Sequence, residues 1–307
     1  MIGLRWGGGE IFHLPPRLSE AAPPRGDLIG SRRIMRGFPL DDVLAQSLPS
    51  PLHALHVHYR YLLCWAKTAA ARRPGARILD FGCGPGTVVE AARGLGLDCS
   101  GADSFYEGEQ DLPVVRNSGL FGTAIRKIEG GKVPFEDGSF DLIVSNQVLE
   151  HVQDLDGTLA ELSRLLRKDG HLLLLFPTRE VIREAHCGIP FLHWLERSPS
   201  RVGYAARWSR LGIGFEKEKK TPEAWAREAV AWMDRFVFYR TWHDVRVLLD
   251  RRFEHAAIEG HYLTYRLGQR RRGGVLAPLF RIPWVEEAGR AVCRRFNGVV
   301  LLARPRR

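Results

Sequence analysis

An acidic residue followed by three closely spaced glycines is the part of this sequence whose residue types most clearly indicate chemistry. Asp80 is followed by Gly82, Gly84 and Gly86 at alternate positions. Because glycine has no Cβ, such a turn can adopt positive φ angles and let a ligand approach its backbone closely. Apolar residues precede the acid, and residues 87–95 repeat apolar side chains at helical spacing. We therefore expect a strand, a turn and a helix that place a ligand at the carboxyl end of the strand, next to free N–H groups.

The acid before the glycines separates this turn from a dinucleotide-binding loop, which has the pattern G-x-G-x-x-G. Asp80 would repel a pyrophosphate but suits a ligand that carries an ammonium group. The run resembles motif I of the class I S-adenosylmethionine-dependent methyltransferases. The resemblance implies that Asp80 and the loop residues bind S-adenosylmethionine, namely Gly82, Cys83, Gly84 and Gly86. The alternative is a structural turn without a ligand.

A second acid lies at the spacing expected for a ribose-binding carboxylate. Residues 97–103 form a predicted strand that ends in Asp103, 23 positions after Asp80. α/β folds place such a carboxylate roughly 20 residues on, where it binds ribose hydroxyls. We therefore expect Asp103 and its neighbour Ser104 to bind the ribose of the cofactor, while a solvated acid in a turn is the alternative.

The segment 132–152 carries the second part of the resemblance. It reads KVPFEDGSFDLIVSNQVLEHV, in which two turn signals precede an apolar strand at 140–145 and Asn146 follows it. This wording is similar to that of the methyltransferase group that includes the quinone-biosynthesis methyltransferases, and the similarity extends over residues 77–180. It implies an α/β fold with a Rossmann-like, seven-stranded, mostly parallel sheet, an antiparallel last strand and helices on both faces. Glu129 and Asn146 complete the residues that we expect at the cofactor.

Three histidines are the candidate catalytic residues. The resemblance places a Glu-His pair beside the methyl-transfer face, so His151 is the leading candidate for a general base. His186 and His193 lie in the histidine- and aromatic-rich segment 184–194, which suits an acceptor pocket. A base is needed only if the acceptor loses a proton, and a packing or surface role is the alternative for each histidine. The five scattered cysteines show no C-x-x-C or other metal-ligand spacing, so we expect no metal site.

The length and composition fit one large domain with additions before the core and after its fifth strand. The chain has 307 residues, of which 45% are hydrophobic. Its N-terminal part contains three consecutive glycines and two proline pairs, which favour an extended arm. We divide the chain into a partly disordered N-terminal arm (1–50), a helix that caps the cleft (51–76), the S-adenosylmethionine-binding core (77–180), an acceptor-site insertion (181–235) and a C-terminal completion of the sheet (236–307).

The C-terminal third is expected to complete the sheet. The sequence Thr241–Asp244 predicts a capping box at the start of a helix. Residues 254–266 and 297–303 are predicted to form the last two strands, which the resemblance makes an antiparallel pair. Between them, residues 268–296 are expected to form an arginine-rich helical insertion that projects from the sheet and does not line the cofactor cleft.

Most of the net charge belongs to this C-terminal segment. Residues 266–307 include eleven arginines and two acidic residues, against a net charge of +10 for the whole chain. A solvated basic face is one interpretation. The other is peripheral contact with an anionic membrane through Arg270–Arg272. The positive charge alone would also allow a nucleic-acid partner. This partner is less favoured, because Ser145–Val148 lacks the Asn/Asp-Pro-Pro-aromatic motif of amino-methylating DNA enzymes.

These features together predict methyl transfer from S-adenosylmethionine to a small-molecule, lipid or saccharide acceptor. The reaction would be an in-line displacement in which positioning supplies much of the rate. The alternatives are an RNA or protein methyltransferase that uses the basic C-terminal segment, and a non-catalytic S-adenosylmethionine-binding relative. The sequence has neither a secretory leader nor an uninterrupted apolar run of about 18 residues, so we expect a cytoplasmic protein that can also associate with a membrane surface. The pattern of residues predicts no oligomeric state.

Overall fold

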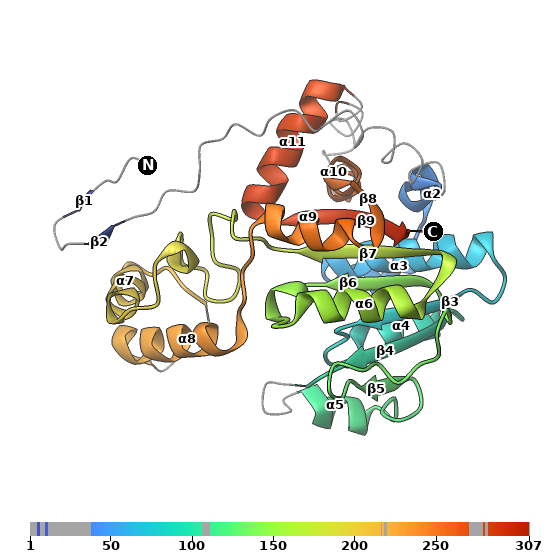
Figure 1. Cartoon of the computed structure of the whole chain (residues 1–307), viewed down its shortest axis with the longest axis horizontal. Helices are drawn as coiled ribbons and strands as arrows, with labels where there is room; N and C mark the ends of the chain where they lie inside the picture. The colour runs from blue at the N-terminus through green and yellow to red at the C-terminus, as the bar shows by residue number, and fades with distance from the viewer. Residues whose placement is uncertain are drawn as a thin grey trace.

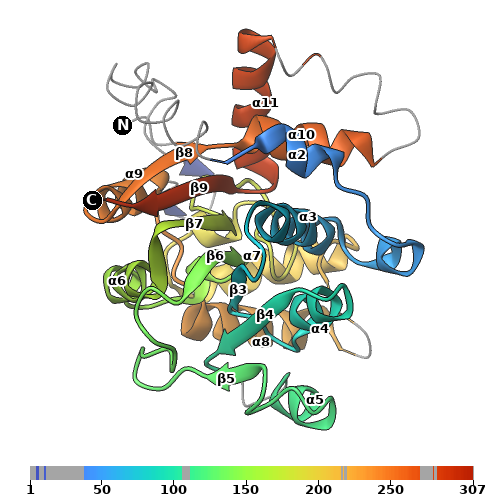
Figure 2. The ribbon, with the colours of Figure 1, turned by 90° about the vertical axis from the view of Figure 1, so that its right-hand side faces the viewer.

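A seven-stranded sheet crosses the molecule, and helices cover both of its faces (Figures 1 and 2). The computed structural model describes residues 5–6, 10–11, 38–105, 111–215, 217, 220–269, 279 and 282–306. The arm expected at 1–50 lies mostly outside the described residues, as does Arg270–Arg272. Within the arm, β1 (Arg5–Trp6) pairs with β2 (Glu10–Ile11), and α2 (Leu40–Ala45) follows.

The order and direction of the strands confirm the predicted fold class. The strands are β3 (Arg77–Phe81), β4 (Asp98–Asp103), β5 (Ile125–Lys127), β6 (Phe140–Asn146), β7 (Leu166–Phe176), β8 (Phe253–Ala257) and β9 (Val299–Pro305). Their spatial order is β5-β4-β3-β6-β7-β9-β8. In this sheet, β3 to β7 pair in parallel, whereas β9 lies antiparallel to both β7 and β8.

Both faces of the sheet carry apolar side chains that are buried under helices. In β3, Ile78 belongs to one hydrophobic cluster and Leu79 to the other, as expected for successive residues that point to opposite faces. One face packs against α3 (Val57–Arg72), α4 (Thr87–Gly94) and α10 (Glu259–Gly268), and the other against α6 (Leu155–Leu165) and α9 (Trp242–Asp250). This two-sided burial explains the continuous apolar runs in β7 and β9.

The helix that was expected to cap the cleft packs into the core over most of its length. Residues 51–76 contain most of a short turn, η1 (Ser50–Ala54), and the whole of α3. Tyr61 and Trp65 of α3 are completely buried in the cluster on one face of the sheet. His58 and Tyr59, at the start of α3, line a cavity beside the carboxyl end of β3. The helix therefore supports the sheet and contributes its first turn to the site.

The strand predicted over 254–266 is wrong in its second half. β8 ends at Ala257, and α10 begins two residues later at Glu259. Tyr262 and Tyr265 lie three residues apart, which is a helical spacing, and both are buried in the cluster that contains α3. The expected helical insertion therefore starts nine residues earlier than position 268. Its second part is α11 (Pro283–Phe296), which rises away from the sheet in Figure 1.

The insertion after β7 forms a small lobe with a hydrophobic core of its own. Its elements are η3 (Leu192–Trp194), α7 (Pro199–Arg210) and α8 (Pro222–Phe236), on the left of Figure 1. Trp225 and Met233 of α8 share a buried cluster with Ala205 of α7 and with Ile189. Because the lobe follows the end of β7, it begins at the edge of the sheet where the parallel strands have their carboxyl ends.

Candidate functional site

The glycine loop after β3 has the backbone that was predicted for it. The φ angles of Gly82, Gly84 and Gly86 are +75°, +49° and +85°. A Cβ on Gly82 would lie 2.2 Å from Val148 Cγ2, and a Cβ on Gly86 would lie 2.5 Å from Ile125 Cδ1. Both positions therefore exclude a side chain by contact as well as by backbone angle.

A cavity of about 350 Å³ lies beside this loop. Its walls include the start of α3 and polar residues at the carboxyl ends of two neighbouring strands, namely Asp80 of β3 and Asn146 of β6. Asn146 Oδ1 is buried and has no hydrogen-bond partner within 3.5 Å. Gln147 also lines the cavity and has a φ of +58°, which is unusual for a residue with a side chain. The ligand space therefore lies at the sheet edge that the sequence predicted.

Two acids at the ends of β3 and β4 differ in how they are held. Asp80 lines the cavity and is buried; this burial, together with the nearby Asp103, raises its pKa to about 7. Asp103 accepts a hydrogen bond from the Gly84 N–H at its Oδ2 and another from the Phe105 N–H at its Oδ1, each at 2.8 Å. Since a carboxylate offers about four acceptor positions, Asp103 retains capacity for hydroxyl groups while it fixes the loop.

The remaining predicted cofactor residues lie around this edge at different depths. Cys83 is buried and lines the cavity. Ser104 is exposed directly after Asp103. Glu129 is exposed beyond β5, and its backbone pairs with that of Lys132. The roles of Ser104 and Glu129 at the cofactor stay predictions.

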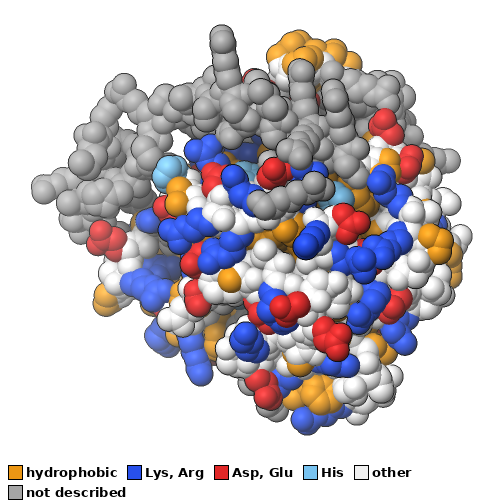
Figure 3. Space-filling view, turned by 45° about the vertical axis from the view of Figure 1, so that its right-hand side comes forward, with side chains coloured by type: hydrophobic (Ala, Val, Ile, Leu, Met, Phe, Trp, Pro, Cys, Tyr) orange, Lys and Arg blue, Asp and Glu red, His pale blue; other side chains and the backbone are white. Residues whose placement is uncertain are grey.

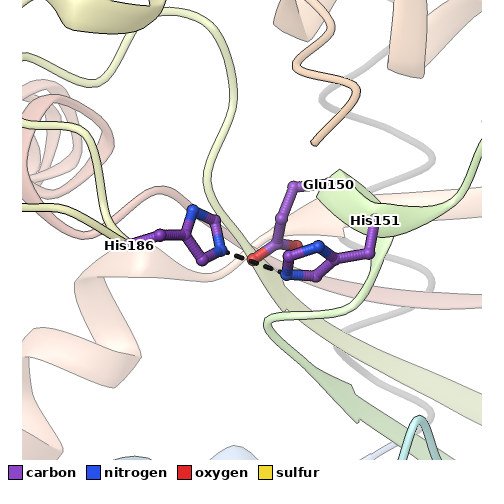
Figure 4. A group of neighbouring side chains, drawn as sticks. All are labelled: Glu150, His151 and His186. Atoms are coloured by element: carbon purple, nitrogen blue, oxygen red, sulfur yellow. Dashed lines mark hydrogen bonds between the residues drawn. The ribbon is translucent and has the colours of Figure 1, made fainter. Parts of the chain in front are cut away.

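His151 and His186 meet in the structure although 35 positions separate them (Figure 4). Their Nε2 atoms are 3.1 Å apart. His151 ends the short turn η2 (Leu149–His151), which follows β6, and His186 lies in the segment between β7 and η3. Trp232 of α8 packs against both rings, with centroid distances of 5.8 Å and 5.1 Å. The fold therefore joins two of the three predicted catalytic histidines.

A buried carboxylate holds His186 from its other side. His186 Nδ1 lies 2.6 Å from Glu184 Oε1, which also accepts a hydrogen bond from the Tyr239 hydroxyl at 2.9 Å. Glu184 Oε2 accepts from the backbone N–H groups of His186 and Cys187. Burial alone would raise the pKa of Glu184, but these hydrogen bonds, led by the one from His186, lower it to about 2. Glu184 is therefore an anion that accepts and does not donate.

A second buried carboxylate, that of Glu150, lies beside the two rings (Figure 4). Neither of its oxygens has a hydrogen-bond partner on another residue, and burial raises its pKa to about 8. Glu150, His151 and His186 each offer a ligand atom, and these atoms lie within 4.8 Å of one another. The expectation that the chain has no metal site rested on spacing along the sequence, which does not reveal a cluster formed by the fold.

His193, the third predicted catalytic residue, occupies a different position. Its ring packs on Tyr239 with a centroid distance of 4.6 Å, and its Nε2 lies 3.2 Å from the Arg179 carbonyl oxygen. Burial lowers its pKa to about 4. The geometry thus makes His193 a neighbour of the residue that holds Glu184. A catalytic role for it stays a prediction.

Sequence reasoning missed the two carboxylates that accompany the histidines. Glu150 precedes His151, and Glu184 lies two positions before His186, so both were visible as neighbours of predicted residues. Tyr239 and Trp232 gave no such signal, because they are separated from their partners by about fifty residues of the lobe. Their positions follow from how α8 returns toward the sheet.

The fold and the site define the class: a Rossmann-like sheet with a glycine-lined cavity after its first long strand and an acid at the end of the next. A family model described as "Methyltransferase domain" matches residues 54–259. The chain therefore belongs to the methyltransferase-domain family, whose cofactor is S-adenosylmethionine.

Two curated relatives are similar in sequence to this chain over part of their length. The ubiquinone biosynthesis O-methyltransferase of Bordetella avium is 32% identical over 126 residues, which cover 39% of this chain and 49% of the relative. The enzyme of the same name from Mesorhizobium japonicum is 27% identical over 170 residues, or 53% of this chain and 67% of the relative. The chain thus matches about half to two thirds of the length of these relatives.

Two solved structures align with this chain at low sequence identity and low TM-score. The YcgJ protein of Bacillus subtilis aligns with a TM-score of 0.43 at 16% identity, over 82% of this chain and 100% of that one. An S-adenosylmethionine-dependent methyltransferase from Mesorhizobium loti aligns with a TM-score of 0.42 at 19% identity, over 78% of this chain and 96% of that one.

The described residues fit S-adenosylmethionine. Gly82 and Gly84 line the cavity without side chains, and the buried Asp80 carboxyl suits the ammonium group of the methionine part. Asp103 suits the ribose hydroxyls, and Asn146 Oδ1 offers an unused acceptor. When bound, the cofactor supplies a methyl group that its sulfonium already activates.

Proposed function

We propose that this protein transfers the methyl group of S-adenosylmethionine to a small-molecule, lipid or saccharide acceptor. The observation that carries the proposal is the cavity lined by Gly82, Gly84 and Asp80, whose loop is held by the hydrogen bond from the Gly84 N–H to Asp103. Because several relatives are named as O-methyltransferases, a hydroxyl is the acceptor group that we favour. Much of the rate would come from holding the acceptor about 3 Å from the methyl carbon, in line with the breaking bond.

The acceptor is proposed to enter on the side of the lobe. Asn146 and Gln147 line the cofactor cavity, and the turn η2 that carries Glu150 and His151 begins two residues later. His186 comes to the same place from the lobe segment. We propose that these imidazole groups face the acceptor, which would meet the methyl group away from water.

A transfer assay with methyl-labelled S-adenosylmethionine and fractionated small-molecule, lipid and saccharide extracts tests this proposal. His151→Ala should leave cofactor binding unchanged within about twofold and lower turnover, because His151 lies beyond the cofactor cavity. Unchanged turnover would remove His151 from the reaction. Labelling of RNA or protein fractions alone, with RNA binding that weakens steeply with salt, would favour the RNA or protein methyltransferase instead. Failure to bind the cofactor would favour a non-catalytic relative.

We also propose a peripheral contact with an anionic membrane through the outer face of α11. Trp284, Val292 and Phe296 are 72%, 56% and 64% exposed, whereas Arg294 and Arg290 turn inward to the completely buried Glu259. The helix thus presents its apolar side outward, within a segment of strong positive charge, as membrane-surface helices do. No helix among the described residues is long and apolar enough to cross a membrane. Figure 3 shows hydrophobic side chains gathered at the top of the molecule.

Sedimentation with phosphatidylglycerol vesicles and with neutral phosphatidylcholine vesicles tests this contact. Trp284→Ser should reduce binding to the anionic vesicles at least about fivefold by removing apolar area from the interface. Leu211→Ser is the matched control, since Leu211 is 74% exposed on the lobe. Equal loss in both variants, or a Trp284→Ser effect on oligomeric state without any vesicle binding, would argue against a lipid partner.

A further inference from the structure

The facing nitrogens of His151 and His186 share either a proton or a metal ion. His151 Nδ1 lies 2.9 Å from the Phe236 carbonyl oxygen, which can only accept, so Nδ1 carries a proton. His186 Nδ1 faces the carboxylate of Glu184 in the same way. In both neutral rings the lone pair is therefore on Nε2, and the two lone pairs face each other at 3.1 Å. Such a contact is repulsive unless a proton or a metal ion lies between the rings.

The third group at this position is the carboxyl group of Glu150. Glu150 is 2% exposed, and both of its oxygens lack a hydrogen-bond partner on another residue. One of these oxygens lies within 4.8 Å of a ring nitrogen of each histidine. A buried carboxyl without a partner is costly, and so is a buried imidazolium. A divalent cation would satisfy all three groups at once.

We propose that Glu150, His151 and His186 form a binding site for a divalent transition-metal ion of the Zn²⁺ type. Two imidazoles and one glutamate are a known protein ligand set for zinc, with further positions left open. Two nitrogens on a tetrahedral Zn²⁺, each about 2.0–2.1 Å from the metal, lie about 3.3 Å apart. The separation of 3.1 Å in the structure is close to this distance.

The surroundings of the cluster have the form expected around metal-binding histidines. Such histidines donate their other ring N–H to a carboxylate or a backbone carbonyl, which fixes the tautomer and the ring orientation. His151 does so to Phe236, at the end of α8, and His186 does so to Glu184. Glu184 is in turn fixed by Tyr239 and by two backbone N–H groups. The lobe therefore supplies one ligand and both orienting groups.

A metal ion here would bear on the reaction through its open coordination position. A hydroxyl that binds a divalent cation loses its proton more easily, so the site would position and activate an acceptor oxygen. This role rests on the proposed function, whereas the binding of the ion does not. The test accordingly measures binding without any acceptor.

Calorimetric titration of the untagged, metal-stripped full chain with ZnCl₂ tests the site. We expect saturable binding of one ion per chain. Loss of an outer partner of a metal ligand typically costs about 10- to 100-fold in affinity, so Glu150→Gln and His186→Gln, which remove ligands, should cost at least that much. His243→Gln is the control, because His243 is exposed on α9, and it should bind like the unaltered chain.

S-adenosylmethionine binding by each variant shows that its sheet is folded, and slow hydrogen exchange in α7 and α8 shows that its lobe is folded. A lost metal signal in such a variant cannot be assigned to unfolding. If the chain binds the metal but has no methyl-transfer activity, the proposed function is contradicted, whereas the proposal of a metal site stands. The proposal is overturned if the stripped chain shows no saturable Zn²⁺ binding. It is also overturned if Glu150→Gln and His186→Gln bind as tightly as the His243→Gln control.

Discussion

The protonation state of Asp80 is set by its surroundings in the cavity. Its pKa is raised to about 7 because the carboxyl is buried and lies near Asp103, so below this pH the group is mainly protonated. Pairing with an ammonium group requires the carboxylate, and binding must then release a proton. We expect the affinity for S-adenosylmethionine to rise as the pH increases through 7, by up to about tenfold per pH unit below it.

Calorimetry in buffers of different ionisation enthalpy measures this proton release directly. Asp80→Asn removes the titrating group, so its binding should be weaker and nearly independent of pH between 6 and 8. A pH dependence that persists in Asp80→Asn would assign the proton to another group at the cavity, such as His58 or Asp111.

Asp103 is expected to contribute to binding in two ways, through the ribose and through the loop. Its Oδ2 accepts from the Gly84 N–H, so Asp103→Ala removes a ligand contact and an anchor of the glycine turn together. Hydrogen bonds to charged groups contribute about 1.5–3 kcal/mol each, which predicts at least about tenfold weaker S-adenosylmethionine binding in a folded chain. Asp98→Ala, at the exposed start of β4, is the control. Unchanged affinity of Asp103→Ala by calorimetry would refute the ribose assignment.

At the scale of elements, the sequence predicted the parts whose pattern is local. The strand and glycine loop at 77–86 follow from residue types alone, and the capping box at Thr241 and Asp244 forms as expected. The segment 254–266 was misjudged because apolar residues such as Tyr262 and Tyr265 suit a strand or a helix equally, and packing against α3 decides between them. For the same reason α3 became a core helix: burial of Trp65 depends on the sheet beneath it, not on its own pattern.

The capping box of α9 gives a test at this scale. Thr241 Oγ1 accepts from the Asp244 N–H at 3.2 Å, and the Asp244 side chain returns to the Thr241 N–H. Thr241→Ala should lower the free energy of unfolding by about 1 kcal/mol, measured by urea denaturation. Thr221→Ala is the matched comparison, because Thr221 caps α8 by a single bond to the Ala224 N–H without a reciprocal partner. An effect of Thr221→Ala as large as that of Thr241→Ala would contradict a contribution from the reciprocal bond.

At the scale of the whole molecule, two separate cores meet at the site. The sheet holds the cofactor cavity, whereas the lobe, with its own buried cluster, delivers His186 and the groups that orient it. The histidine cluster could not be assembled from the sequence, because His151 and His186 meet only when the lobe folds back on the end of β6. This division predicts that damage to the lobe core separates cofactor binding from the chemistry on the acceptor side.

Trp225 is the residue on which this separation can be measured. It is 4% exposed in the lobe cluster, and its Nε1–H donates to the Phe215 carbonyl oxygen at 2.8 Å. Trp225→Ala should destabilise the lobe by about 3–5 kcal/mol, which hydrogen exchange would show as faster opening of α7 and α8 than of the strands. S-adenosylmethionine affinity should change by less than about twofold, since the cavity belongs to the sheet, while methyl transfer falls. Leu211→Ala, on the exposed surface of the same lobe, should leave both unchanged. Loss of cofactor binding in Trp225→Ala in proportion to transfer would show that the two cores fold as one unit.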